Sequence, residues 1–385
     1  MKNCLVISDP PAAPGFLPRL RYLCDYLVRR GYGVTLLTES YQPLPFAHAY
    51  PIEQITMYSG STFDWFVKSV WTLLTDWHNR AFAKKFLTAK RSNSVSGLTS
   101  NSEAAYDCVI CTTFNEFPLG AAQRIAKHLR VPLICDIRDL DEQVDHSRYQ
   151  YHHQSMLLMP FRHIYRAIHI RRRNAVLRAA KVVTTVSEWH ADFIRQFNKN
   201  VHVVYNGFDP ATFFPEDQKS DVFRVSYIGS LAEWQKKGLT KVKIAIEQAN
   251  LKLKTMNIIM DEHTPQKNPI PFEQMGEAIR RSSMMLVLTD TRTHGMLTTK
   301  FYEALGCEKP VLCVPSDKGE LARLIEYTHA GIATNDKQVM QDFIEEKYRE
   351  WKSRGYTRQE TAHREDFSRE TQCQRFEEIL NTILS

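Results

Sequence analysis

No apolar run in this 385-residue chain approaches the about 20 residues that a membrane-spanning helix requires. The first residues, MKNCLVISDPP, also lack the apolar stretch and the cleavage site of a signal peptide. Hydrophobic residues make up 43% of the chain and charged residues 24%, which is typical of soluble globular proteins. We therefore expect a cytoplasmic protein, and its length suffices for two domains of ordinary size.

Three chemical signatures are also missing. Cys108 and Cys111 form a C-x-x-C pair inside an expected strand, but no second pair completes a zinc site. The loop DPPAAPGF has a single glycine, Gly15, where a dinucleotide fingerprint needs three, which disfavours a dehydrogenase. Asp139 and Asp141 have D-x-D spacing but lie in the first half of the chain, so we expect no metal and no cofactor.

The formal charge of +7 is distributed unevenly. Residues 1–210 contain 25 basic and 17 acidic side chains, whereas residues 211–385 contain 25 and 26. An acidic surface or partner is therefore expected for the N-terminal half only.

Strands that alternate with helices predict a parallel, doubly wound sheet in each half of an α/β protein. In the first half, strands are expected at 4–8, 34–38, 108–112, 133–136, 182–186 and 202–205, and helices at 17–30, 63–87, 119–128, 156–180 and 188–197. A Ser-rich loop is expected at 91–105 and a turn-rich linker at 206–221. In the second half, strands are expected at 223–228, 257–260, 284–288, 311–314 and 331–333, and helices at 239–249, 272–282 and 318–327. The last helix, 371–384, has an apolar stripe and should pack against another element; the stripe consists of Phe376, Ile379, Leu380 and Ile383.

Segment 284–315 has the most informative pattern. A strand-like apolar run is followed by a polar loop and then by a short helix, which Thr298 or Thr299 can cap and Gly306 can end. A helix that starts at the carboxyl end of a strand directs its N–H groups into the crevice above the sheet. The pattern therefore indicates an anion site.

Charged side chains strengthen this interpretation. Lys300 adds a positive charge in the first turn, and Glu303 could accept hydrogen bonds from sugar hydroxyls. We interpret the segment as a seat for the diphosphate and ribose of a nucleotide sugar. The alternative is an ordinary strand–helix–strand unit with a solvent-facing Lys300 and Glu303.

Two further loops could contribute to this site. Gly229 follows an expected strand and allows close backbone approach, while Lys236 or Lys237 in the same loop could reach an anion. In the first half, Gly15 leaves room beside a reacting sugar. The alternative for both is a plain surface turn.

Five motifs, taken together, resemble a known family. They are ICDIRDL at 134–140, AAKVVTTVSEWHADFI at 179–194, VYNGFD at 204–209, YIGSL with KKG at 227–238, and KFYEALGCEKPVL at 300–312. Their order and spacing resemble the retaining glycosyltransferases of the GT-B fold, in particular the large family-four-like group of bacterial polysaccharide and lipopolysaccharide transferases.

This resemblance implies two Rossmann-like domains facing a central cleft. Residues 1–207 would bind the acceptor, residues 208–370 the nucleotide sugar, and helix 371–385 would pack back on the N-terminal domain. Glu303 would bind the ribose, and Lys237 and Lys300 the diphosphate. The expected donor-binding residues are Gly15, Gly229, Ser230, Lys236, Lys237, Gly295, Thr298, Thr299, Lys300 and Glu303.

The sequence departs from the family pattern at two positions. Gly295 stands where the family usually has a Glu that contacts the transferred sugar, eight residues before the ribose-binding Glu303. Ser230 stands where Arg is common. The usual contacts to the donor sugar are therefore in question.

The implied reaction moves a sugar from a nucleotide diphosphate, UDP or GDP, to an acceptor hydroxyl with retention of configuration. No metal is required, because cationic side chains neutralise the diphosphate. In retaining members the leaving phosphate itself can take the acceptor proton. Candidates for a catalytic group are Asp139, Glu116 and His294, and each could instead have a positioning role.

Basic and aromatic residues of the first half indicate a membrane surface. One face of the helix at 161–181 carries Arg162, Arg166, His169 and Arg173, and another carries Phe161, Ile164, Tyr165, Ile168 and Val176. Segment 63–87 adds Trp65, Trp71, Trp77, Lys68, Arg80, Lys84 and Lys85. Such mixtures suit an anionic membrane, and the alternative is a solvated helix face over an apolar core. Nucleic acid is disfavoured, because no binding motif accompanies the charge.

We therefore predict a cytoplasmic GT-B glycosyltransferase that acts in cell-surface polysaccharide or lipopolysaccharide synthesis, at the inner face of the membrane if its saccharide acceptor is lipid-linked. Two alternatives stay open. One is a nucleotide-sugar epimerase of the same fold. The other is a catalytically silent nucleotide-sugar-binding protein, which Gly295 favours.

Overall fold

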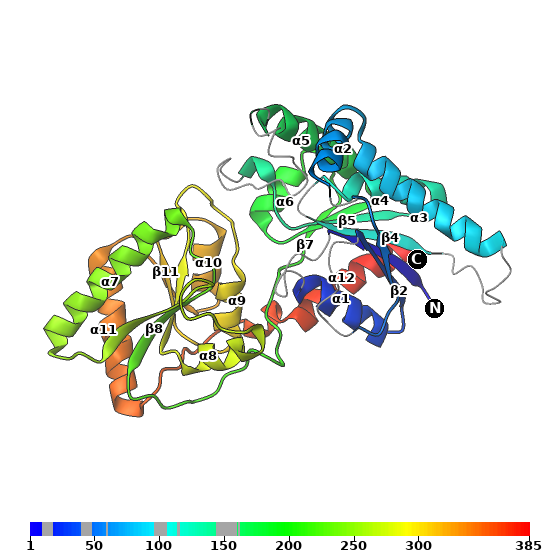
Figure 1. The fold of residues 1–385 in the computed structure, drawn as a ribbon. Helices are drawn as coiled ribbons and strands as arrows, with labels where there is room; N and C mark the ends of the chain where they lie inside the picture. Colours follow the sequence, from blue (N-terminus) through cyan, green and yellow to red (C-terminus); the bar gives the residue numbers. More distant parts are fainter. Residues whose placement is uncertain are drawn as a thin grey trace. The chain divides into compact units, whose positions relative to one another are not determined.

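The computed structural model consists of two units, each built on its own parallel sheet (Figure 1). The first unit comprises residues 1–186, 190–204 and 375–385, and the second comprises 187–189 and 205–374. The structure describes residues 1–9, 18–39, 48–58, 61–95, 106–113, 116–143, 160 and 162–385. Among these residues, no helix is both long enough and apolar enough to cross a bilayer.

The first unit contains a seven-stranded parallel sheet in the order β3-β2-β1-β4-β5-β6-β7. The strands are β1 (Asn3–Ser8), β2 (Gly33–Glu39), β3 (Ile52–Ile55), β4 (Cys108–Thr113), β5 (Leu133–Ile137), β6 (Val182–Thr185) and β7 (Val201–Val203). Residues of β4 and β5 are buried throughout, which explains why these strands appear in the sequence as continuous apolar runs.

Helices cover both faces of this sheet. They are α1 (Pro18–Arg29), α2 (Thr62–Thr75), α3 (Trp77–Val95), α4 (Leu119–Leu129), α5 (Arg162–Ala179), most of α6 (Glu188–Ile194) and the C-terminal part of α12 (Arg369–Leu384). Figure 1 shows α3, α4 and α5 on one face and α1 with α12 on the other. Phe82, Phe86 and Ile125 of α3 and α4 pack with Val109 and Cys135 of the sheet to form the core on the first face.

The second unit contains a five-stranded parallel sheet in the order β12-β11-β10-β8-β9. Its strands are β8 (Phe223–Ile228), β9 (Ile258–His263), β10 (Met284–Leu288), β11 (Val311–Val314) and β12 (Gly331–Ala333), and its helices are α7 (Glu233–Leu253), α8 (Met275–Arg281), α9 (Thr299–Gly306), α10 (Glu320–Tyr327) and α11 (Lys337–Arg354). Met285 and Val287 of β10 pack toward α9, whereas Leu286 and Leu288 pack toward α7 and α11. Because side chains alternate along a strand, one apolar run serves both cores. The expected doubly wound α/β fold is thus confirmed.

Several expected boundaries were wrong. The helix expected at 63–87 is two helices, because Asp76 has φ 59° and ends α2 in the left-handed conformation. Helix α3 continues to Val95, so the segment expected to be a Ser-rich loop begins inside a helix. Residues 96–105 lie outside the described part. Strand β3 was not expected, since its sequence IEQI is polar and partly exposed.

The basic face expected on α5 was also wrong in part. Arg173 is buried and pairs with Glu142, which follows β5. The His169 ring lies beside Glu116, and Arg166 donates to the carbonyl of Asp141. These side chains neutralise polar groups at the carboxyl end of the sheet and do not form a solvated surface. Phe161 and the Arg162 side chain lie outside the described residues.

Candidate functional site

The topology of the second unit singles out the point between β8 and β10. These strands are neighbours in the sheet, and the chain continues from β8 to β9 on one side and from β10 to β11 on the other. In open α/β sheets, ligands bind beyond the carboxyl ends of the strands at such a switch point. Here those ends are Ile228 and Leu288.

The loop after β8 is held close to the sheet. Gly229 has φ +127°, a value that L side chains rarely adopt, and its N–H donates to the carbonyl of His263 at 2.8 Å. The Tyr227 hydroxyl donates to the carbonyl of Ser230 at 2.5 Å. Gln235 accepts from the Ala232 N–H at 2.8 Å and donates to the Leu288 carbonyl at 3.1 Å. Hydrogen bonds therefore hold the loop to the carboxyl ends of β8, β9 and β10.

Helix α9 brings Lys300 to the same place. Thr298 caps the helix, and its side chain accepts from the Lys300 N–H at 3.4 Å. A Cβ at residue 229 would lie 2.6 Å from Lys300 Cε and 2.9 Å from Lys300 Nζ. Lys300 Nζ also lies 5.4 Å from the centre of the Tyr227 ring. Gly229 thus leaves the space that the Lys300 side chain occupies, and the structure brings these two expected site residues together.

The charges of α9 are perturbed by burial. Burial lowers the pKa of Lys300, and the nearby Glu303 carboxylate opposes this shift. Burial also raises the pKa of Glu303, against the opposing charges of Arg369 and Lys300 and a hydrogen bond with Thr299. Both residues are half-buried, and partial exclusion of water strengthens an electrostatic interaction with an anionic ligand.

Lys236 and Lys237 were expected in the loop, and this was wrong. Helix α7 begins at Glu233, because Gln235 caps the Ala232 N–H and starts the helix six residues before the expected position. Both lysines are exposed on its surface, and Lys236 pairs with Glu233 at 2.5 Å. Ser230 remains in the loop and is exposed.

Gly295 is buried against an aromatic side chain. A Cβ at this position would lie 2.2 Å from Trp189 Cβ. The neighbouring His294 accepts from the Glu320 N–H through its carbonyl at 2.7 Å, and its Nδ1 lies 2.9 Å from the Asp317 carbonyl. This loop is therefore fitted to the start of α10 and has no room for the glutamate that the family pattern places at residue 295.

The other two catalytic candidates lie in the first unit. Glu116 is buried and accepts from Asn79 Nδ2 at 2.6 Å, while its other carboxylate oxygen lies 3.7 Å from His169 Nδ1. Burial, aided by the charge of Asp76, raises the pKa of Glu116 to about 8. Asp139 is half-exposed and lies 3.9 Å from His190 Nε2. Gly15 lies outside the described residues.

Sequence reasoning missed a set of buried polar residues at the carboxyl end of the first sheet. Glu39, the last residue of β2, lies 3.2 Å from His78 Nε2, and both side chains are buried. Asp9, directly after β1, accepts from Thr113 Oγ1 at 2.7 Å and from Arg138 at 3.0 Å. Their positions in the sequence could have identified these residues, because Asp9 and Glu39 each stand where an apolar strand ends.

Solved structures of similar fold cover nearly the whole chain. Anabaena Alr3699/HepE, solved with UDP and glucose, is 14% identical with a TM-score of 0.61 and covers 98% of this chain and 99% of its own. S. aureus MnaA, solved with UDP, is 13% identical with a TM-score of 0.54, covering 100% and 98%. Starch synthase IV from Arabidopsis thaliana, bound to ADP and acarbose, is 11% identical with a TM-score of 0.59, covering 100% and 99%. At these identities the likeness shows the fold alone.

No curated protein matches the sequence. A family model does match, and its description is Glycosyltransferase Family 4. The match extends over residues 19–212, which is half of the chain. The chain therefore belongs to glycosyltransferase family 4.

Proposed function

We propose that this protein transfers a sugar from a nucleotide-diphosphate sugar to an acceptor hydroxyl. The observation that carries the proposal is the position of Lys300 over Gly229, at the carboxyl ends of β8 and β10. A lysine and a helix N-terminus at a switch point suit the diphosphate of a nucleotide.

Each residue of this site has a role in the proposal. Lys300 and the first N–H groups of α9 bind the diphosphate, and Glu303 binds the ribose hydroxyls. As the glycosidic bond breaks, the leaving diphosphate gains negative charge, which these groups stabilise more in the transition state than in the ground state. Losing one such contact costs about 2.7–4 kcal/mol of barrier, or about 100- to 1,000-fold in kcat.

The finer features of the reaction are proposals on the same footing. The nucleotide is UDP or GDP, and the two neighbours solved with UDP favour UDP. Configuration is retained, and the leaving phosphate takes the acceptor proton. Transfer proceeds without a metal, so EDTA should leave the rate unchanged. The acceptor is a saccharide of cell-surface polysaccharide or lipopolysaccharide synthesis, lipid-linked and reached at the inner face of the membrane.

Gly295 favours a second candidate, a protein that binds a nucleotide sugar without turning it over. Residue 295 is a glycine where related enzymes have the glutamate that contacts the transferred sugar, and Trp189 fills the space beside it. Tight nucleotide binding without donor hydrolysis above background would support this candidate. Incubation with donor alone tests the remaining alternative, since an epimerase would convert the nucleotide sugar without an acceptor.

Nucleotide binding measured by calorimetry and thermal shift tests the site directly. UDP, GDP, CMP and their sugars are titrated first, because a ligand that binds only the folded state raises the melting temperature. We expect Lys300→Ala to weaken binding of the preferred nucleotide about 10- to 100-fold, the loss expected for a charge-assisted hydrogen bond. Glu303→Gln should weaken binding of the nucleotide but not of inorganic pyrophosphate.

Lys337→Ala is the matched control for this experiment. Lys337 is an exposed lysine at the first position of α11, in the same unit, and α11 follows the edge strand β12, which is two places from β10 in the sheet. Its loss should leave nucleotide affinity unchanged. Unchanged affinity in Lys300→Ala and Glu303→Gln as well would show that the nucleotide binds elsewhere.

A further inference from the structure

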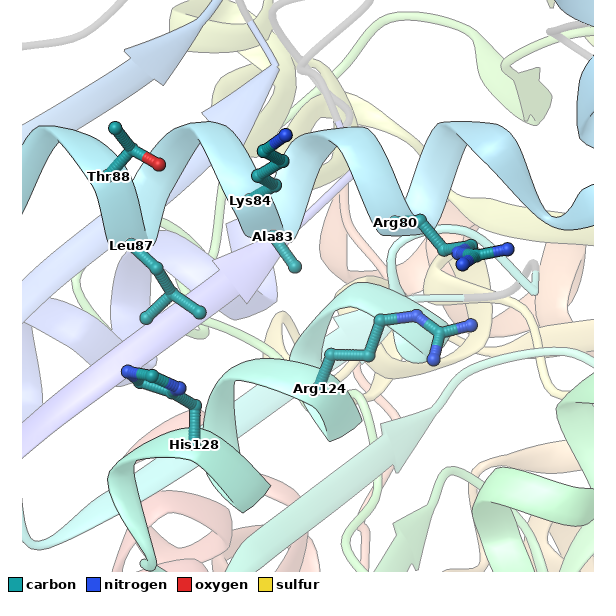
Figure 2. Close-up of a pocket in the computed structure, with 7 residues that line it drawn as sticks. All are labelled: Arg80, Ala83, Lys84, Leu87, Thr88, Arg124 and His128. Atoms are coloured by element: carbon teal, nitrogen blue, oxygen red, sulfur yellow. The ribbon is translucent and has the colours of Figure 1, made fainter.

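A basic groove lies between α3 and α4 of the first unit (Figure 2). Its volume is about 390 Å³, and its floor is apolar, formed by Ala83 and Leu87. Its cationic or titratable side chains are Arg80, Lys84, Arg124 and His128. In Figure 2 the guanidinium groups of Arg80 and Arg124 point toward the same end of the groove, and His128 lies toward the other.

The charges of this groove are arranged for an anion. Arg80 and Lys84 are exposed and stand four residues apart on α3, where like charges destabilise a helix. Arg124 extends from α4 toward the Arg80 end of the groove and pairs with Asp76, whereas the Lys84 side chain points away from α4 in Figure 2. Three full cations thus line the groove against one carboxylate. A bound anion would relieve the repulsion between these cations. The basic excess of residues 1–210 would also attract an anion to this unit.

The basic end of the groove adjoins an exposed apolar helix. Arg80 donates to the Thr75 carbonyl at 3.5 Å, and Asp76, the partner of Arg124, directly follows α2. The last two turns of α2 expose Trp71 by 52% and Leu74 by 70%. The other end of α2 exposes Phe63 by 75%.

We propose that α2 and the α3–α4 groove together dock the protein on an anionic phospholipid bilayer. Headgroup phosphates bind Arg80, Lys84 and Arg124, while Trp71 and Leu74 enter the interface. A soluble anion would explain the cations but not the exposed apolar residues beside them, whereas an anionic bilayer offers both a charged and an apolar layer. This inference rests on the proposed transfer to a lipid-linked acceptor and names the surface that brings the enzyme to it.

Vesicle co-sedimentation of the full chain tests the proposal. We expect binding to vesicles of phosphatidylcholine mixed with phosphatidylglycerol, little binding to phosphatidylcholine alone, and loss of binding in high salt. Arg80→Glu with Lys84→Glu should lower the partition coefficient more than about 20-fold, since each cation near the surface contributes about fivefold. Trp71→Ser with Leu74→Ser should also lower it without changing the salt dependence.

Two matched controls accompany these variants. Lys127→Glu reverses an exposed charge of α4 outside the groove, and Leu251→Ser removes an apolar side chain that is 79% exposed on α7 in the other unit. Leu251→Ser should leave the partition coefficient unchanged, and Lys127→Glu should lower it far less than Arg80→Glu with Lys84→Glu does. Thermal melting followed by circular dichroism reports the folding of every variant, and nucleotide affinity, measured on each, keeps a failure of this proposal separate from a failure of the donor site.

Three results would overturn the proposal. One is the absence of binding to phosphatidylglycerol vesicles. Another is equal binding by wild type and the Arg80→Glu, Lys84→Glu variant. The third is binding of inorganic phosphate or heparin that these substitutions abolish while vesicles are ignored, because the groove would then serve a soluble phosphate or an acidic polysaccharide.

Discussion

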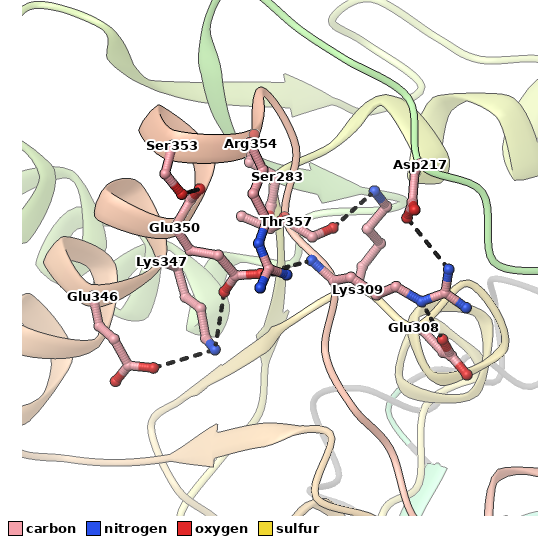
Figure 3. Close-up of polar contacts among 11 residues, drawn as sticks. Asp217, Ser283, Glu308, Lys309, Glu346, Lys347, Glu350, Ser353, Arg354 and Thr357 are labelled. Atoms are coloured by element: carbon pink, nitrogen blue, oxygen red, sulfur yellow. Dashed lines mark hydrogen bonds and ion pairs between the residues drawn. The ribbon is translucent and has the colours of Figure 1, made fainter.

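At the scale of single residues, burial perturbs the ionisation of Lys309, whose polar contacts are drawn in Figure 3. Its side chain is 2% exposed, and its Nζ donates to the Thr357 carbonyl at 3.4 Å. Burial lowers the pKa of Lys309 to about 8, against the opposing influence of Cys307 and Asp217. A lysine whose pKa is lower in the folded state than in the unfolded state destabilises the fold at every pH at which the unfolded chain carries its charge.

We expect Lys309→Met to raise the free energy of unfolding by up to about 3.5 kcal/mol at pH 7, because the pKa falls from 10.5 to about 8 at roughly 1.4 kcal/mol per pKa unit. The gain should shrink as pH rises from 8 toward 10.5, because wild-type Lys309 is then neutral when folded and becomes neutral when unfolded. Urea denaturation of wild type and variant at pH 7 and at pH 9.5 measures this gain in the free energy of unfolding. Lys347→Met is the contrast: Lys347 pairs with Glu346 and Glu350, so its loss should give no such gain. A destabilised Lys309→Met variant at pH 7 would contradict this account.

Glu116 should show the opposite pH dependence. Its pKa of about 8 exceeds the unfolded value of about 4.5, so the folded state binds the proton more tightly. Stability contributed by protonated Glu116 is therefore complete below pH 4.5 and is lost between pH 4.5 and 8. Glu116→Gln keeps an acceptor for Asn79 and cannot ionise. We expect its melting temperature to match wild type at pH 4.5 and to exceed it at pH 8. Equal melting temperatures at pH 8 would show that Glu116 ionises freely.

At the scale of elements, the C-terminal helix contributes to the first unit. Residues 375–385 of α12 belong to that unit, where Phe376 and Leu380 are buried. Glu377 accepts from the Tyr26 hydroxyl at 2.7 Å and from Arg30 at 3.0 Å. The ion pair is half-exposed at Arg30 and should contribute little, so apolar burial is the main attachment.

We therefore expect Leu380→Ala to destabilise the first unit by about 2–5 kcal/mol, the range for a large-to-small change in a core. Hydrogen exchange should accelerate in β1 and α1 but not in β10 and β11 of the second unit. Glu378→Ala, an exposed change on the same helix, is the control and should leave exchange unchanged. Equal acceleration in both units would mean that they unfold as one.

The elements that the sequence predicted most accurately are those that are most deeply buried. Strands such as β4, β8 and β10 were expected at or within one residue of their bounds, because burial on both faces makes them continuous apolar runs. Strand β3 was missed because its sequence, IEQI, has two polar residues in the middle and none of its four residues is fully buried. The start of α7 was missed because a side-chain cap by Gln235, and not an apolar period, begins the helix.

At the scale of the whole molecule, the chain forms two sheets that differ in strand order. The first order, β3-β2-β1-β4-β5-β6-β7, reverses between β1 and β4, and the second reverses between β8 and β10. Asp9 and Arg138 gather near the first switch point, and Gly229 and Lys300 near the second. The donor-site proposal depends on the second.

The sequence by itself determined the alternation of strands and helices, the family resemblance and the short helix with Lys300, because each depends on local pattern. Only the tertiary structure decided which residues meet. It brought Lys300 to Gly229, 71 residues earlier in the chain, placed Lys236 and Lys237 on the exposed face of α7, and closed the space beside Gly295 with Trp189. The physical reason is that such contacts depend on strand order and side-chain packing between distant segments, which no local periodicity records.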